Sequence, residues 1–137
     1  MLKKTITYTD YDGNERTEDF YFNLSRSEII LLETTTPGGY TAMLQRIIDS
    51  KDNIELMRIF TELIKKSYGV KSEDGKRFIK NDQVVEEFLS SAAFDELFTE
   101  FFTTENAAAD FAKGILPQEA IKGLPQDHKS KDLSVVK

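Results

Sequence analysis

The sequence has no cysteine, no tryptophan and a single histidine among its 137 residues. Without cysteine the chain can form no disulfide, no zinc–thiolate site and no cysteine nucleophile, which a cytoplasmic protein tolerates. His128 has no second histidine to share a metal ion, and the tail composition around it argues against a rigid Ser-His-Asp triad. The common phosphate-binding loops, G-x-G-x-x-G and G-x-x-x-x-G-K-[ST], are also missing. We therefore expect no catalytic residue, no cofactor-binding residue and no metal ligand, and hence no enzyme.

Long apolar runs and clustered basic charge are also lacking. The longest apolar run, Ile29–Leu32, is far shorter than the roughly 20 residues of a membrane span. The first residues do not contain the apolar stretch of a signal peptide. A net charge of −6 argues against a nucleic-acid-binding surface, which needs clustered Lys and Arg. We expect a soluble cytosolic protein with neither a membrane nor a nucleic acid as partner.

The N-terminal part of the chain, residues 3–23, has a period of two. Its apolar residues alternate with polar ones on both sides of the segment DYDGNE, in which Asp12-Gly13-Asn14 favours a tight reversal. DYDGNE superficially resembles a calcium loop, but Gly13 is the fourth residue from Asp10, whereas an EF-hand loop has its glycine sixth. The pattern therefore predicts a β-hairpin, whose apolar face needs a helical cover because a lone hairpin is unstable. This face carries Ile6, Tyr8, Phe20 and Phe22.

Helical periodicity follows the hairpin. Ser25 or Asn23 caps a first helix to about residue 33, with Glu28 in the capping-box position, and the run Ile29–Leu32 predicts burial on several sides. The segment TTTPGG breaks the chain before a second helix over 40–49. A third helix is capped by Asp52 or Asn53 and ends at Gly69 as its C′ residue. Its predicted stripe is Ile54, Met57, Phe60, Ile64 and Tyr68.

The second half of the chain adds a polar loop and further helices. We interpret residues 72–80 as a polar connector that Phe78 and Ile79 hold against the helices. Asn81 or Asp82 opens a fourth helix, which continues or restarts over 92–102, and Thr104 caps a last helix over 105–113. Residues 118–137 are poor in apolar residues, and this composition is typical of a flexible tail with at most a short helical turn at 118–122.

These patterns together predict an α+β fold that is mostly α. We expect a single domain over 1–117, in which the hairpin (3–23) packs on a bundle of about five helices (25–116), followed by a disordered C-terminal tail (118–137).

Aromatic residues are the most distinctive positive feature. Six of the ten phenylalanines fall between Phe88 and Phe111. Most of them are typical of a helical core, but those around residue 98 cover more than one face of a helix, which favours a partner surface. Burial of one phenylalanine side chain is worth roughly 1.5–3 kcal/mol, so several exposed ones would drive self-association or client binding. The candidate protein-binding residues are Phe94, Leu97, Phe98, Phe101 and Phe102.

The segment Tyr68–Pro117 resembles the C-terminal half of the tail assembly chaperones of long-tailed phages and prophages of Gram-positive bacteria. Three motifs carry the resemblance in this order: Ser-x-Asp-Gly-Lys-x-Phe at 72–78, Phe88 followed by Ser-x-Ala-Phe-x-x-Leu at 91–97, and Ala-x-x-Phe-x-x-Gly-Ile-Leu-Pro at 108–117. The N-terminal segment DYDGNERTEDFYFNLS is also similar to that family, so the resemblance covers most of residues 3–117.

The resemblance implies a non-enzymatic function in the cytoplasm of a bacterial host. Such proteins bind the tape-measure protein, keep it soluble, help the tail-tube protein polymerise around it and are absent from the finished virion. Many also have a longer form made by ribosomal frameshifting, and a homo-oligomer is expected. The family offers no catalytic residues to transfer. The competing hypothesis is a small structural virion component, such as a head–tail connector or a tail subunit.

Overall fold

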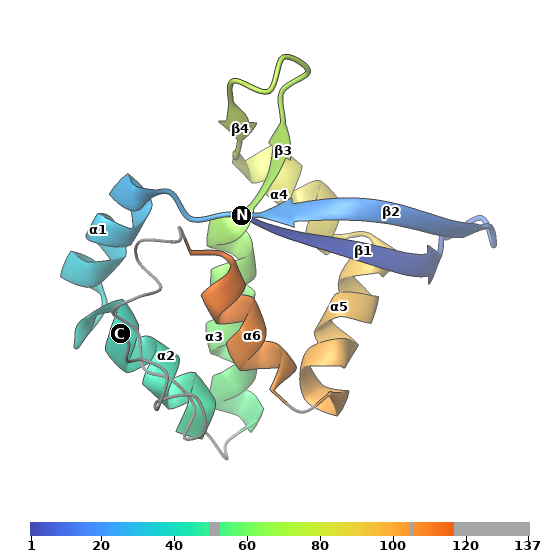
Figure 1. Cartoon of the computed structure of the whole chain (residues 1–137). Coiled ribbons are helices and arrows are strands. Elements are labelled where there is room, and N and C mark those ends of the chain that lie inside the picture. Colours follow the sequence, from blue (N-terminus) through green and yellow to red (C-terminus); the bar gives the residue numbers. More distant parts are fainter. Residues whose placement is uncertain (50–52, 105, 117–137) are drawn as a thin grey trace, which may run out of the picture.

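The computed structural model describes residues 1–49, 53–104 and 106–116, and in this part a four-stranded antiparallel sheet packs with six helices (Figure 1). This confirms the predicted mostly helical α+β class. The predicted tail at 118–137 and the candidate cap Asp52 lie outside the described residues. The strands have the order β1-β2-β3-β4, and they are β1 Leu2–Thr9, β2 Glu15–Phe22, β3 Tyr68–Lys71 and β4 Phe78–Ile79.

The predicted hairpin forms from β1 and β2. Its turn is organised by Asp10, whose carboxylate accepts hydrogen bonds from the backbone N–H groups of Asp12 and Asn14 (both 2.9 Å) and from the Arg16 side chain (2.6 Å). These bonds, that from Arg16 first, hold the pKa of Asp10 below its usual value. Gly13 takes a φ of 87°, which a glycine adopts without steric cost. The acidic cluster therefore builds a turn, as the spacing predicts.

The inner face of the hairpin lies on the helices. Ile6 and Phe22 are buried, and Tyr8 and Phe20 pack against the core from its edge. Lys4 joins this face to α5 (Ala92–Thr103) through an ion pair of 2.9 Å with Glu100. Figure 1 shows the turn end of the hairpin reaching out beyond the helices.

The second half of the sheet is absent from the sequence prediction. The helix α3 (Asn53–Ser67) ends two residues before Gly69, which pairs with Tyr21 in the sheet and does not take a positive φ. The expectation of a helix C′ glycine is therefore wrong. A Cβ at Gly69 would lie 2.6 Å from the ring of Phe78, so glycine is required here by close packing between strands.

The expected connector 72–80 contains the turn of a β3–β4 hairpin and the strand β4 itself. Asp74 accepts hydrogen bonds from the Ser72 hydroxyl (2.7 Å) and from the Lys76 backbone N–H (3.0 Å), and the Ser72 hydroxyl in turn accepts one from the Arg77 N–H (3.0 Å). The residues expected to hold the connector in place form β4.

The first two helices follow the predicted boundaries closely. Helix α1 (Arg26–Thr35) begins after Ser25 with the predicted capping box, in which the Ser25 N–H donates a hydrogen bond of 2.8 Å to the Glu28 carboxylate. The expected burial of its apolar run on several sides is wrong, because Leu32 is buried while Ile30 and Leu31 are 63% and 62% exposed. Helix α2 (Gly39–Asp49) follows the break and buries Leu44 and Ile47.

The remaining helices correct two details of the prediction, the stripe of α3 and the role of Thr104. In α3 the core face is Ile59, Phe60, Leu63 and Ile64, whereas Ile54 and Met57 of the predicted stripe are exposed. Helix α4 (Asp82–Leu89) is capped by Asn81 as predicted, and α5 is a separate helix that begins after Ser91. Thr104 ends α5 instead of capping the next helix, because its N–H donates to the Glu100 carbonyl (3.0 Å). Helix α6 (Ala107–Gly114) completes the fold.

Helix α6 is joined to α2 by a buried tyrosine. The Tyr40 hydroxyl donates to the Ala112 carbonyl at 2.8 Å, one of the last carbonyls of α6 that have no partner inside the helix. Burial raises the pKa of Tyr40 well above its ordinary value. The phenol therefore remains a neutral donor to the end of α6.

Lys80 joins three segments that are far apart in the sequence. Its ammonium donates to the backbone oxygens of Asn23 (2.7 Å) and Lys66 (2.8 Å) and to both carboxylate oxygens of Glu28 (2.7 and 2.8 Å). The charge thus binds the end of β2, the last turn of α3 and the first turn of α1. Two backbone carbonyls and one carboxylate depend on this one side chain.

We predict that Lys80→Met lowers the free energy of unfolding by about 1.5–3 kcal/mol, the usual worth of hydrogen bonds to a charged group. Urea denaturation of the full chain measures the change. Lys76→Met, an exposed lysine in the β3–β4 turn, is the matched control and should change stability by less than about 0.5 kcal/mol. Equal effects of the two substitutions would contradict this account of Lys80.

The same contact predicts acid sensitivity. Partial burial raises the pKa of Glu28, but hydrogen bonds from Lys80 and Ser25 lower it more, so the net pKa lies below its ordinary value. A lowered pKa in the fold stabilises the protein above the unfolded pKa of about 4.3, and this contribution is lost as the pH falls through the folded value. We expect Glu28→Gln to reduce the loss of stability below about pH 4.3, measured by urea denaturation across pH. An unchanged acid profile would show that Glu28 does not contribute.

Candidate functional site

The helix α5 carries all five residues that the sequence singles out. Ser91 positions it, because its hydroxyl accepts a hydrogen bond from the Phe94 N–H (3.4 Å) and donates one to the Phe88 carbonyl (2.7 Å). The same side chain therefore follows the end of α4 and caps the start of α5. This fixes where α5 begins relative to the end of α4.

Two stripes of apolar residues run along α5, each with a spacing of four. One stripe is buried and consists of Ala93, Leu97 and Phe101. Within it, Phe101 stacks on Phe60 of α3 (ring centroids 4.5 Å apart) and contacts Phe111 of α6 (5.1 Å). This stripe joins α5 to the core.

The other stripe is partly exposed and consists of Phe94, Phe98 and Phe102, which we call the aromatic ridge. The Phe98 ring lies between the other two, with centroids 5.5 Å from Phe94 and 5.1 Å from Phe102. Phe94 and Phe102 also pack against the buried core, whereas Phe98 stands outside the set of described side chains that do so. Phe98 is therefore the ridge residue best placed to contact another protein.

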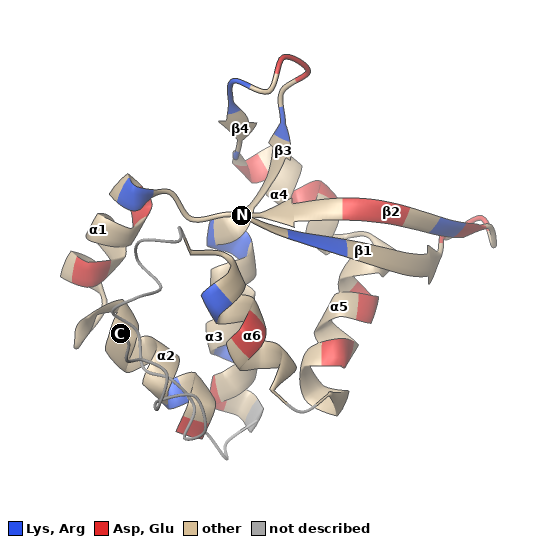
Figure 2. Ribbon diagram, in the orientation of Figure 1, with Lys and Arg blue, Asp and Glu red and all other residues tan. Residues whose placement is uncertain are grey.

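Acidic side chains border the ridge. Asp95 and Glu96 are exposed on α5, and the helix contains no basic residue. Figure 2 shows this distribution, with red and no blue on α5. Glu100, the third acidic residue of α5, already has a partner within the chain, because Lys4 forms an ion pair with it. A partner with an apolar strip flanked by Lys or Arg would match this surface.

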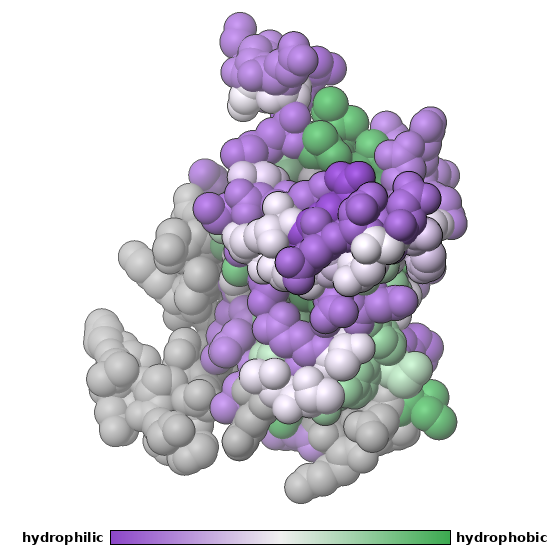
Figure 3. Space-filling view, turned by 90° about the vertical axis from the view of Figure 1, so that its right-hand side faces the viewer, coloured by the Kyte–Doolittle hydropathy of each residue, from purple (hydrophilic) through white to green (hydrophobic). Residues whose placement is uncertain are grey.

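The ridge ends at a hollow in the protein surface. A cavity of about 300 Å³ is lined by residues of four helices, among them Phe102, Ile48, Leu56 and Ala108. Phe102 belongs to both features, so the ridge leads into the cavity, whose lining is mixed because Thr103, Thr104, Asn106, Asp110 and Lys113 lie beside its apolar side chains. Figure 3 views the molecule from the side of α5, and hydrophobic atoms are visible above and below the hydrophilic end of the hairpin.

The structure thus separates the five predicted binding residues into two groups. Leu97 and Phe101 are 0% and 5% exposed and lie in the core, so they support the ridge from below. The three ridge residues remain accessible in part. Contact of any of the five with a partner stays a prediction. The sequence missed the exposed residues Ile30 and Leu31 of α1, although four consecutive apolar residues cannot all share one face of a helix.

Metal binding and membrane insertion find no support in the described part of the chain. Among its residues, no three or more His, Cys, Asp or Glu side chains are grouped so that they could hold a metal ion. No helix in this part has the length and apolar character needed to cross a membrane.

The fold is that of a small, mostly helical protein with a partly exposed aromatic ridge that acidic side chains border. Residues 1–135 match the model of a family described as phage tail assembly chaperone, and because this match covers nearly the whole chain, the protein belongs to that family. Membership indicates a non-enzymatic role and interaction with tail proteins. Neither a curated protein nor a solved structure matches the chain.

The division of α5 into a core stripe and a ridge can be tested directly. We predict that Leu97→Ala lowers the free energy of unfolding by about 2–5 kcal/mol, because it leaves a cavity in the core. Phe98→Ala should cost no more than about 1.5 kcal/mol, the worth of its ring contacts. Urea denaturation measures both, and a larger loss for Phe98→Ala than for Leu97→Ala would place Phe98 in the core.

Proposed function

We propose that this protein binds the tape-measure protein of a long-tailed phage through the aromatic ridge and keeps it soluble before the tail tube encloses it. The observation that carries the proposal is a row of three partly exposed phenylalanines on a helix of a tail assembly chaperone. Partner contact would bury what remains exposed of these rings. One fully buried phenylalanine contributes roughly 1.5–3 kcal/mol, so the ridge can supply the main part of a moderate affinity.

The acidic border of the ridge supports a particular kind of client surface. An apolar helix with basic residues along its edges would place its side chains on Phe98 and its charges near Asp95 and Glu96. Contacts between exposed charges are screened by salt, with a Debye length of about 8 Å at physiological ionic strength. Affinity for the client should therefore fall as salt increases, while the apolar part of the contact persists.

The finer features of the function belong to the same proposal. The protein acts in the cytoplasm of the bacterial host and is not retained in the virion. It assists polymerisation of the tail-tube protein, and a longer frameshifted form of the chain is a further partner. Self-association through the ridge would form a homo-oligomer. The client would then displace the second copy of the chain from the ridge.

We predict that Phe98→Asp abolishes solubilisation of the tape-measure protein, because it places a charge in the centre of the ridge. Co-expression of the full chain with that protein, followed by measurement of its soluble fraction, tests this. Tyr11→Asp is the matched control, since Tyr11 is an exposed aromatic residue in the β1–β2 turn, and it should leave solubilisation unchanged. Thermal unfolding verifies that both variants fold. A client that stays soluble with Phe98→Asp, or is insoluble with the unaltered chain, would overturn the proposal.

Absence from the virion is tested separately. We expect mass spectrometry of purified phage particles to detect the tail-tube and tape-measure proteins but not this chain. A stoichiometric amount of the chain in the particles would instead identify it as a structural component, such as a head–tail connector or tail subunit.

A further inference from the structure

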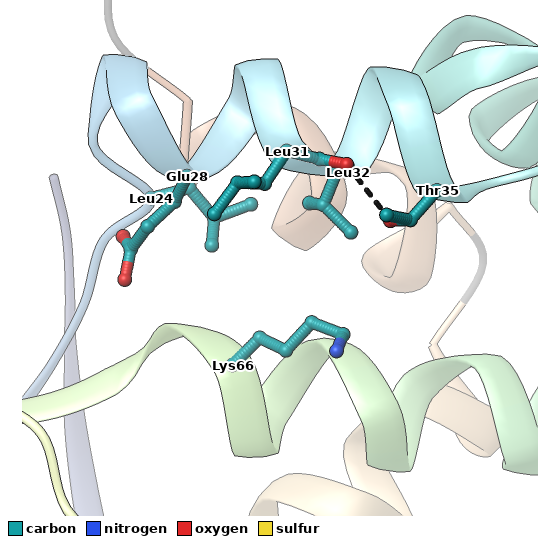
Figure 4. Close-up of a pocket in the computed structure, with 6 residues that line it drawn as sticks. All are labelled: Leu24, Glu28, Leu31, Leu32, Thr35 and Lys66. Carbon is teal, nitrogen blue, oxygen red and sulfur yellow. Dashed lines mark hydrogen bonds between the residues drawn. The ribbon is translucent and has the colours of Figure 1, made fainter.

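An apolar cavity lies between α1 and α3, and Figure 1 shows α1 on the opposite side of the molecule from α5. The cavity has a volume of about 250 Å³, and we call it the α1–α3 groove. Figure 4 shows its two walls, with Leu31 and Leu32 on α1 facing Lys66 on α3. Leu24 and Leu32 are buried, while Leu31 at the rim is 62% exposed. The groove is lined by Leu24, Glu28, Leu31, Leu32, Thr35 and Lys66.

The two charges of the groove differ in their partners. The Glu28 carboxylate is held by Lys80. The backbone carbonyl of Lys66 accepts a hydrogen bond from Lys80, but among the described residues the Lys66 ammonium forms no ion pair. In Figure 4 the Lys66 side chain extends along the groove. An occupant with apolar side chains and one acidic group would fit this arrangement.

The described part of the chain ends close to the groove. The Leu24 N–H, at one end of the groove, donates to the Ile115 carbonyl at 2.7 Å. Leu116, the last described residue, is 2% exposed. The last described residues therefore lie beside the groove. The sequence that follows them, PQEAIKGLP over 117–125, contains two large aliphatic residues and one acid, namely Ile121, Leu124 and Glu119.

We propose that residues 117–125 of the same chain occupy the α1–α3 groove. Ile121 and Leu124 pack on Leu31 and Leu32, and Glu119 pairs with Lys66. The eight residue-to-residue steps from Leu116 to Leu124 can span up to about 26 Å, whereas the seven steps along α1 from Glu28 to Thr35 rise only about 10 Å. Reach is therefore ample, and closing so short a loop costs little entropy.

The proposal involves neither the aromatic ridge nor the tape-measure protein. Its outcome is consequently independent of the proposed function.

The absence of cysteine makes a clean distance measurement possible. Thr34, exposed on α1, and Lys122 are each replaced by cysteine in the full chain and labelled with nitroxide. Pulsed electron paramagnetic resonance then measures the distance between the labels. We expect one narrow, short distance population. A broad distribution in the otherwise unaltered chain would overturn the proposal.

Two adjacent aliphatic residues of α1 provide the matched control. Leu31 lines the groove and Ile30 does not, although their exposures are nearly equal. With the labels in place, Leu31→Asp should broaden the distribution and Ile30→Asp should leave it narrow. Equal responses would contradict docking in the groove. Dilution with excess unlabelled chain separates the two possible sources of the segment, because loss of the short distance on dilution would mean that another copy supplies it and would overturn the proposal.

Discussion

The described fold depends on the three residues Phe22–Leu24, where the chain leaves the hairpin and crosses to α1. The Phe22 ring is buried and contacts the rings of Tyr68 (centroids 5.5 Å apart), Phe88 (5.7 Å) and Phe111 (5.2 Å). The next two backbone N–H groups donate to the carbonyls at the ends of α3 and α6, Ser67 (2.8 Å) and Ile115 (2.7 Å). Because these partners are distant in the sequence, this crossing segment joins the sheet to both α3 and α6.

Lys80 completes the crossing from the opposite direction. It binds the Asn23 carbonyl that the backbone would otherwise leave without a donor, and it does so together with Glu28 and the Lys66 carbonyl. Leaving a partly buried carbonyl group without a hydrogen bond costs free energy. The Lys80 ammonium supplies hydrogen bonds that a neighbouring strand would supply in a longer sheet. Lys80 directly follows the strand β4, so this strand of only two residues sets the position of the lysine.

Local signals made much of the fold predictable from the sequence. The hairpin, the Ser25 capping box and the Asn81 cap each depend on residues close together in the chain. The strands β3 and β4 were missed because they contain only four and two residues, and β3 exists through pairing with β2 about 47 positions away. The sequence predicted the helix that carries the candidate site, but not which face of this helix is exposed. Both stripes of α5 are apolar, and only the positions of β1, α3 and α6 decide that Leu97 and Phe101 are buried.

The core between the two surfaces argues against communication between them. Coupling requires an element with two discrete arrangements that both sites favour differently. From the aromatic ridge inward, Phe102 contacts Phe60 edge to face (6.4 Å), and Phe60 stacks on Phe101. Phe60 and Phe101 belong to one continuous cluster of buried side chains, which also includes Leu24 and Leu32 beside the groove. Close-packed interiors of this kind deform little. Binding of a client to the ridge should therefore not change the conformation of the α1–α3 groove. Only contacts made at the groove itself should change it.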